Sequence, residues 1–139
     1  MKNLIIVLLI FLSQQICNRC EAQDILQSTL VWNSSSNTNQ RDNELTSYTC
    51  SFTTVTNQKI TWSQGNSKVT NYTVVSVDGA WTDVTADGKV VYHISDKGTN
   101  AEITFFRTEG VAAIRMTFYL NGKVNFDYVF QIDSITAQP

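Results

Sequence analysis

The sequence has little that would interrupt an extended chain. Its only proline is the last residue, Pro139. Proline cannot donate to the hydrogen-bond ladder of a sheet and is confined to strand edges and bulges, so its absence elsewhere leaves every segment free to form a central strand. Outside the N-terminal segment, no stretch of useful length shows the 3.6-residue apolar period of an amphipathic helix. The sequence therefore favours β structure.

Cysteine is also scarce. Cys17 and Cys20 lie in the N-terminal segment that we expect to be removed, which leaves Cys50 alone in the mature chain. A domain with one cysteine has no internal disulfide. Its core must therefore hold the fold without the covalent support that is common in small exported domains.

Basic runs are absent, and the charge is nearly balanced. Without residues 1–22 the chain has 117 residues, with eight Lys and Arg against eleven Asp and Glu. This mild acidic balance argues against binding of nucleic acid or of an anionic membrane surface. A chain of about this length builds one domain around one core, so residues 23–139 are expected to form a single all-β domain.

Residues 1–22 have the features of a cleaved secretory signal. Lys2 gives a positive start, residues 4–12 are apolar, and Cys20 and Ala22 place small residues at the −3 and −1 positions. The apolar run is shorter than the roughly 20 residues that span a bilayer. We therefore expect a secreted or periplasmic protein with no membrane span after cleavage. The rival interpretation, a lipoprotein anchored through Cys17 or Cys20, lacks the small residue that should precede the cysteine.

A hairpin is the strongest local signal. Asn121-Gly122 lies between two aromatic-rich runs, and this pair suits a type I′ turn, which needs positive φ at both central residues. On each side of the pair, apolar residues alternate with others at a period of two, as along a strand with one buried face. The alternating apolar residues are Ile114, Met116, Phe118 and Leu120 before the turn, and Val124, Phe126, Tyr128, Phe130 and Ile132 after it.

The rest of the chain repeats this pattern and predicts an antiparallel meander of about eight or nine strands. Short alternating runs are separated by turn residues at the spacing typical of a barrel or sandwich. Residues 33–43 are expected to be a polar loop, and residues 80–85 a brief fifth strand. Closure into a small up-and-down barrel of calycin or lipocalin type removes exposed edges. A two-sheet β-sandwich is the alternative, because spacing alone does not separate the two architectures.

Gly79-Ala80-Trp81 resembles the Gly-x-Trp signature of the lipocalins. In that family the signature belongs to the first barrel strand, whereas here it falls in the middle of the chain. The resemblance covers three residues, and no lipocalin site residue is transferred. It implies only that a calycin-type barrel is an admissible architecture.

The candidate ligand-binding residues are aromatic. Trp32, Trp62 and Trp81 occupy three separate segments, and with Tyr119 they would line a ligand site if their faces converged in a barrel mouth. As core fillers the tryptophans would need no function. Arg115 would bind a carboxylate if it faced the interior of a wide barrel, and would be solvated if it faced outward.

No catalytic or metal-binding motif is apparent. A nucleophile and base could be formed only by Cys50 and His93, and no local pattern places them together. Asp78, Asp83 and Asp87 recur near turns but lack the 1-3-5 spacing of a calcium loop, so ordinary turn chemistry explains them better. We expect neither a metal nor a cofactor, and no enzymatic activity.

Two functions remain. The first is an exported, non-enzymatic barrel that binds a small apolar or amphipathic ligand. The alternative is an extracellular module of sandwich type for protein interaction or adhesion, possibly through an edge strand. A ligand carrier should have a lined cavity of roughly 300 Å³ or more, whereas a sandwich would be filled throughout.

Overall fold

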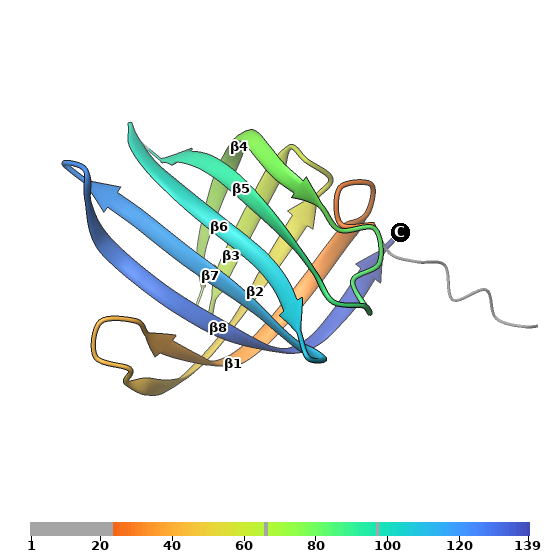
Figure 1. Cartoon of the computed structure of the whole chain (residues 1–139), viewed down its shortest axis with the longest axis horizontal. Coiled ribbons are helices and arrows are strands. Elements are labelled where there is room, and N and C mark those ends of the chain that lie inside the picture. Colours follow the sequence, from red (N-terminus) through yellow and green to blue (C-terminus); the bar gives the residue numbers. More distant parts are fainter. Residues whose placement is uncertain (1–23, 66, 97) are drawn as a thin grey trace, which may run out of the picture.

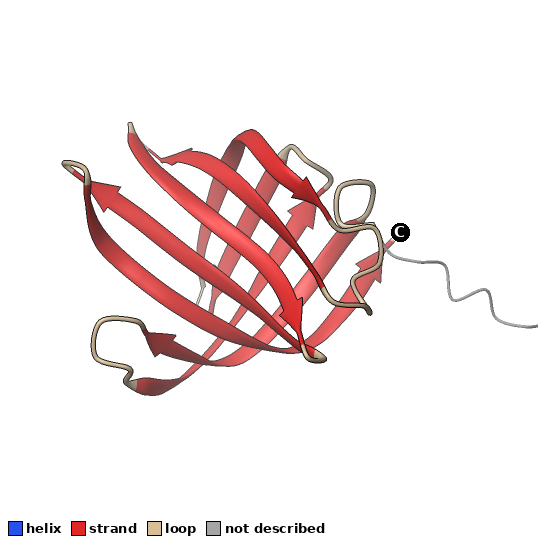
Figure 2. Cartoon of the chain, in the orientation of Figure 1, coloured by secondary structure: helices blue, strands red, loops and turns tan. Residues whose placement is uncertain are grey.

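The computed structural model describes residues 24–65, 67–96 and 98–139. The expected signal segment, residues 1–22, lies outside the described residues. The described part is built from strands joined by short connections (Figure 2). These strands are β1 (Thr29–Asn39), β2 (Leu45–Val55), β3 (Lys59–Gln64), β4 (Lys68–Ala80), β5 (Gly88–Asp96), β6 (Thr99–Thr108), β7 (Val111–Leu120) and β8 (Lys123–Gln138).

The strands form a closed barrel in which each one pairs with its neighbours in sequence (Figure 1). All the pairs are antiparallel, and β1 pairs with β8 from Thr29 opposite Gln138 to Asn39 opposite Tyr128. This last pairing removes both edges of the sheet. The prediction of an all-β, up-and-down barrel is therefore confirmed, and the sandwich alternative is wrong.

The predicted hairpin is confirmed as the connection between β7 and β8. Asn121 has a φ of 52° and Gly122 a φ of 73°, as a type I′ turn requires. Beyond the turn, Phe118 pairs with Phe126 and Ile114 with Phe130. Around these pairs the two apolar series face the same side of the sheet, whereas next to the turn a register shift places Val124 opposite Tyr119.

The predicted polar loop over residues 33–43 is only partly correct. β1 continues to Asn39, and residues 40–44 alone connect it to β2. This part of β1 pairs with β2 on one side and with β8 on the other. Because a ladder uses backbone N–H and C=O groups, a run of serine and asparagine forms a strand where both neighbours supply partners.

The predicted strand over residues 80–85 is wrong, because only Ala80 lies in a strand. The rest belongs to the connection between β4 and β5. The Asp83 carboxylate accepts hydrogen bonds from the Thr85 N–H (2.9 Å) and hydroxyl (2.6 Å). Trp81 and Val84 are buried, so the segment is apolar because it packs over the end of the barrel and not because it pairs.

The core is densely filled beneath this connection. Ile25 anchors residues 24–28 there by donating its N–H to the Trp81 carbonyl (3.1 Å). Trp32 lies below, with its ring centroid 5.7 Å from that of Trp81 and 5.0 Å from that of Phe105. The largest fully buried side chains are Trp32, Tyr92, Phe52, Phe105, Phe130, Ile25, Leu30, Ile60, Ile103, Ile114, Met116 and Val84.

Candidate functional site

The two ends of the barrel differ in how they are covered. On the right of Figure 1, residues 24–28 and the β4–β5 connection lie over the packed core. On the left, the β1–β2, β5–β6 and β7–β8 connections surround the other end (Figure 1). Among the described residues, no comparable segment covers this end. This open end, which we call the mouth, is the candidate site.

Aromatic rings line the mouth. Trp62, on β3, stacks on Phe52 with ring centroids 5.8 Å apart and planes at 4°, and meets Phe130 edge-on at 5.8 Å. The rings of Tyr48 and Phe126 lie 6.3 and 6.4 Å from that of Trp62. Tilted and edge-on pairs of this kind are the favoured aromatic geometries. They make a rigid apolar wall around the opening.

Polar atoms lie buried among these rings without hydrogen-bond partners. Among the described residues, the unpartnered atoms are Asn37 Oδ1, Trp62 Nε1 and Gln64 Nε2. Tyr48 donates its hydroxyl to Gln64 Oε1 at 2.9 Å, which turns Gln64 Nε2 away from the tyrosine. The Trp62 N–H has no oxygen or nitrogen acceptor. The Cys50 sulfur lies beside it, but sulfur is a weak hydrogen-bond acceptor. Buried polar groups are nearly always paired in proteins, so such a cluster needs an explanation.

A β-bulge brings Asn37 into the barrel. The register of β1 shifts between Ser34 and Ser36 against both β2 and β8. The Ser34 hydroxyl donates to the Ser36 carbonyl at 2.9 Å. An extra residue reverses which side chains face inward, so Asn37 is 8% exposed and faces the interior opposite Thr46 and Phe130.

Two adjoining cavities open at this end, each of about 320 Å³. The first, which we call the mouth cavity, is lined by Asn37, Thr46, Tyr48, Trp62, Gln64, Phe126, Tyr128 and Phe130. The second, the rim cavity, is lined by Trp62, Thr99, Phe118, Tyr119, Leu120, Asn125 and Phe126. The two share Trp62 and Phe126. None of the residues lining either cavity is Lys, Arg, Asp or Glu.

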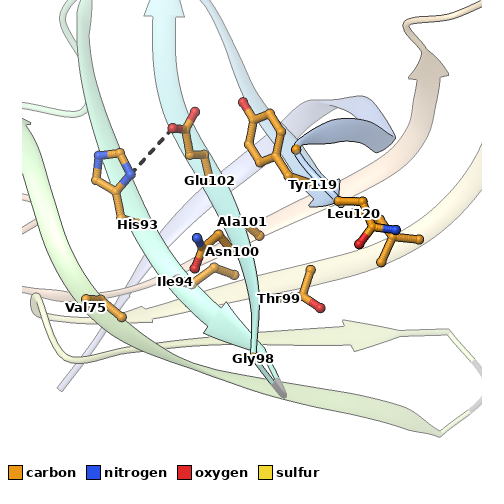
Figure 3. Close-up of a pocket in the computed structure, with 12 residues that line it drawn as sticks. Val75, His93, Ile94, Gly98, Thr99, Asn100, Ala101, Glu102, Tyr119 and Leu120 are labelled. Carbon is orange, nitrogen blue, oxygen red and sulfur yellow. Dashed lines mark ion pairs between the residues drawn. The ribbon is translucent and has the colours of Figure 1, made fainter.

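A larger hollow of about 660 Å³ lies along the outer wall, near the tips of the β5–β6 and β7–β8 hairpins (Figure 3). Its histidine lies within ion-pair distance of two acidic groups. His93 Nε2 lies 2.6 Å from Asp78 Oδ2, and His93 Nδ1 lies 3.5 Å from Glu102 Oε1. Burial, followed by the charge of Glu102, raises the pKa of Tyr119. The histidine and the acidic groups of this hollow therefore already engage one another, whereas the mouth has buried polar atoms without partners.

Arg115 faces outward and is paired. Its Nε and Nη2 atoms donate to the two carboxylate oxygens of Asp127 at 2.8 and 2.7 Å. Such a two-point pair is among the stronger hydrogen-bonding arrangements. This pair holds the guanidinium on the outer wall, so Arg115 is not placed to bind a carboxylate inside the barrel.

The structure does not bring Cys50 and His93 together. Cys50 is buried inside the barrel on β2, and His93 is on the outer face of β5. The three aspartates considered for calcium also serve separate partners. Asp78 contacts His93, Asp83 binds Thr85, and Asp87 accepts from two backbone N–H groups of the β6–β7 turn. In the part of the chain that is described, no three His, Cys, Asp or Glu side chains cluster as a metal site would require.

Burial makes the interior sensitive to alkaline pH. It raises the pKa of the Cys50 thiol from 9.0 to about 11, opposed by the Trp62 N–H, and it raises the pKa of Tyr92 and of Tyr48. The folded state therefore keeps these groups neutral at a pH at which the unfolded chain ionises. Their contribution to stability is complete below about pH 9 and is lost as the pH rises through the folded pKa.

We expect the free energy of unfolding to fall by about 2 kcal/mol between pH 9 and 11 through Cys50 alone, since each pKa unit is worth about 1.4 kcal/mol and some solvent reaches the thiol. Urea unfolding of the protein at several pH values measures this. The Cys50→Ala variant should start less stable but lose less over the same range. Parallel pH profiles for the two proteins would contradict the assignment to Cys50.

The structure separates the four aromatic residues proposed from the sequence. Trp62 lines both cavities of the mouth, and Tyr119 lines the rim cavity. Trp32 and Trp81 lie in the filled end, where their N–H groups donate to Thr54 Oγ1 (3.3 Å) and to the carbonyl of residue 86 (3.0 Å). Only Trp62 and Tyr119 therefore share a cavity.

Other lining residues were not singled out from the sequence. Gln64 follows Ile60 and Trp62 at a period of two, and this signal places it on their face. Phe126 and Tyr128 belong to the alternating series after the hairpin turn. Asn37 gave no such signal, because its inward position depends on the bulge in β1.

Comparison of the chain with protein-family models, with curated proteins and with solved structures gave no match. In the described residues there is no helix of the length and apolar character needed to cross a bilayer. The geometry of the mouth is therefore the main indication of function.

Proposed function

We propose that this protein is an exported, non-enzymatic barrel that binds a small apolar or amphipathic molecule at its open end. The observation that carries the proposal is a cavity of about 320 Å³ with aromatic walls and unpartnered polar atoms. Sites for small molecules typically combine concave apolar walls with a few fixed polar groups, and they often lie in the mouths of β-barrels. The mouth cavity has each of these features.

The design of the barrel supports binding at one end only. The aromatic and aliphatic core beneath Trp81 fills the other end, so a ligand would enter from the mouth and stop at Phe52 and Phe130. Rigid walls lower the conformational entropy lost on binding. Catalysis would need a nucleophile or an acid and base converging on the same space, and the residues lining the mouth cavity include none that is ionised at neutral pH.

Native mass spectrometry of the protein purified from its own source tests the proposal. We expect a bound small molecule in addition to the mass of the chain. Thr46 is exposed at the edge of the mouth cavity, so a Thr46→Trp variant should fill the entrance and reduce the occupied fraction about tenfold or more.

Thr136→Trp is the matched control, because Thr136 is exposed near the filled end of the barrel, opposite Val31. It should retain the bound molecule. A clean mass for the unmodified chain, or equal occupancy in the two variants, would count against a ligand site at the mouth.

Binding of an extracellular protein partner is a second candidate, favoured by apolar side chains around the mouth. Leu45, Val69, Leu120 and Val124 are all exposed at the ends of strands that border this opening. Exposed apolar residues gathered in one place mark interaction sites more often than scattered ones do. Recovery of a partner by the unmodified chain and by Thr46→Trp, but not by a Leu45→Glu, Leu120→Glu double variant, would favour this function.

A further inference from the structure

The unpartnered atoms at the mouth differ in hydrogen-bonding character. Asn37 Oδ1 can only accept a hydrogen bond, whereas Gln64 Nε2 and Trp62 Nε1 can only donate. Asn37 and Trp62 are 8% and 9% exposed, so bulk water reaches them poorly. A molecule that satisfies this set must offer both a donor and an acceptor.

The residues that line the mouth cavity include no Lys, Arg, Asp or Glu. The nearby ionised side chains are engaged elsewhere: Arg115 pairs with Asp127 on the outer wall, and Arg41 donates to the carbonyls of Val124 and Asn125 at 2.8 and 2.7 Å. A charged ligand group would lose its hydration without gaining a counter-ion, which is costly in a poorly hydrated site. A carboxylate would also have no proton to give Asn37 Oδ1.

The size and the walls of the cavity limit the size and the shape of the apolar part of the ligand. At about 30 Å³ per water, a cavity of about 320 Å³ takes the place of roughly ten waters, which corresponds to a molecule of about a dozen non-hydrogen atoms. The rings of Trp62, Phe126 and Tyr128 provide flat apolar surfaces beside the polar atoms. A compact, flat body suits these walls.

We propose that the mouth cavity selects an uncharged ligand of carboxamide type, whose polar group donates to Asn37 Oδ1 and accepts from Gln64 Nε2 or Trp62 Nε1 while its apolar body lies against the aromatic wall. This inference rests on the proposed function and adds the chemical class of the ligand. In this proposal Asn37 and Gln64 determine specificity for the polar group of the ligand, and the aromatic rings of the wall supply most of the affinity.

Three probes with the same ring system test the inference: 2-naphthamide, 2-naphthoate and naphthalene, each measured by equilibrium dialysis against the mature chain at neutral pH. The amide should bind about tenfold or more tightly than either of the others, because only the amide pairs both kinds of buried atom. This ranking needs no variant and so does not depend on the folding of one.

Two asparagine variants then locate the effect. Asn37→Leu keeps a similar volume but removes the acceptor, so the affinity for 2-naphthamide should fall about tenfold while that for naphthalene does not fall. Asn71→Leu is the matched control, since Asn71 is exposed and accepts from Thr61 at 2.9 Å. It should leave the ranking of the three probes unchanged.

The outcomes separate the two proposals. Equal binding of the three probes, or tighter binding of 2-naphthoate, would overturn the carboxamide inference and leave a ligand site at the mouth. Loss of amide binding in Asn71→Leu as much as in Asn37→Leu would also overturn it. If none of the probes binds and native mass spectrometry finds no ligand, the proposed function itself fails.

Discussion

Replacing Trp32 with alanine is expected to lower the free energy of unfolding by about 3–5 kcal/mol, the usual cost of truncating a large buried aromatic side chain. Trp32 is fully buried, packs against Trp81 and Phe105, and donates its N–H to Thr54. Its removal leaves a closed apolar space under the β4–β5 connection. Because a small domain has only about 5–15 kcal/mol of stability in total, the variant should be largely unfolded at moderate urea concentrations.

Trp62→Ala is the matched comparison. Trp62 is of the same type and is also buried, but it borders cavities that open at the mouth. Water can enter the space that it leaves and reach polar partners there, so we expect a loss of stability smaller by about 1–2 kcal/mol. Urea unfolding of both variants measures the difference. Equal losses would mean that the two ends of the barrel are not packed differently.

Replacing Gly88 with alanine should cost about 2–3 kcal/mol. A Cβ atom at this position would lie 2.2 Å from Trp81 Cδ1 and 2.4 Å from Trp81 Nε1. The indole cannot move aside freely, because its N–H donates to the carbonyl of Ala86 at 3.0 Å and its ring packs on Trp32. The substitution therefore forces the β4–β5 connection away from the core that it covers.

Gly65→Ala provides the control for the loss of glycine itself. A Cβ atom there would meet only the Thr49 carbonyl oxygen at 3.5 Å, an ordinary contact, and the φ of Gly65 is not in the left-handed region. Alanine should be neutral or stabilise by about 0.4–1 kcal/mol, since it restricts the unfolded chain. Thermal unfolding of the two variants side by side checks this. A similar loss in both would show that contact with Trp81 is not the cause.

The difference between the filled end and the mouth explains how much of the fold could be predicted. Val90, Tyr92 and Ile94 alternate because one face of β5 meets the core, and this periodicity is a local property. The segment around Trp81 is apolar for another reason, since it lies across the end of the barrel. Sequence alone cannot distinguish an apolar segment that pairs as a strand from one that covers the end of a barrel. The pattern therefore predicts a strand over residues 80–85, where the structure has a connection.

The candidate site depended still more on distant contacts. Trp62 and Tyr119 could be proposed from their chemistry, but their position at the mouth, and that of Trp32 at the filled end, follows from the register of the closed barrel. Asn37 became a candidate only through the bulge at Ser34–Ser36, which shifts the register of β1 against both neighbouring strands. A polar run offers no periodic signal from which such a shift could be predicted.

The sequence by itself determined most of the strands, their antiparallel order and the Asn121–Gly122 turn, because alternation and turn chemistry act between residues that are close in the chain. Only the tertiary structure decided that the sheet closes between β1 and β8, which end is packed, and which polar atoms are left unpaired inside. Those features arise where residues from different strands meet, at the closure from opposite ends of the described chain. Their free energies depend on distances and burial that no local pattern contains.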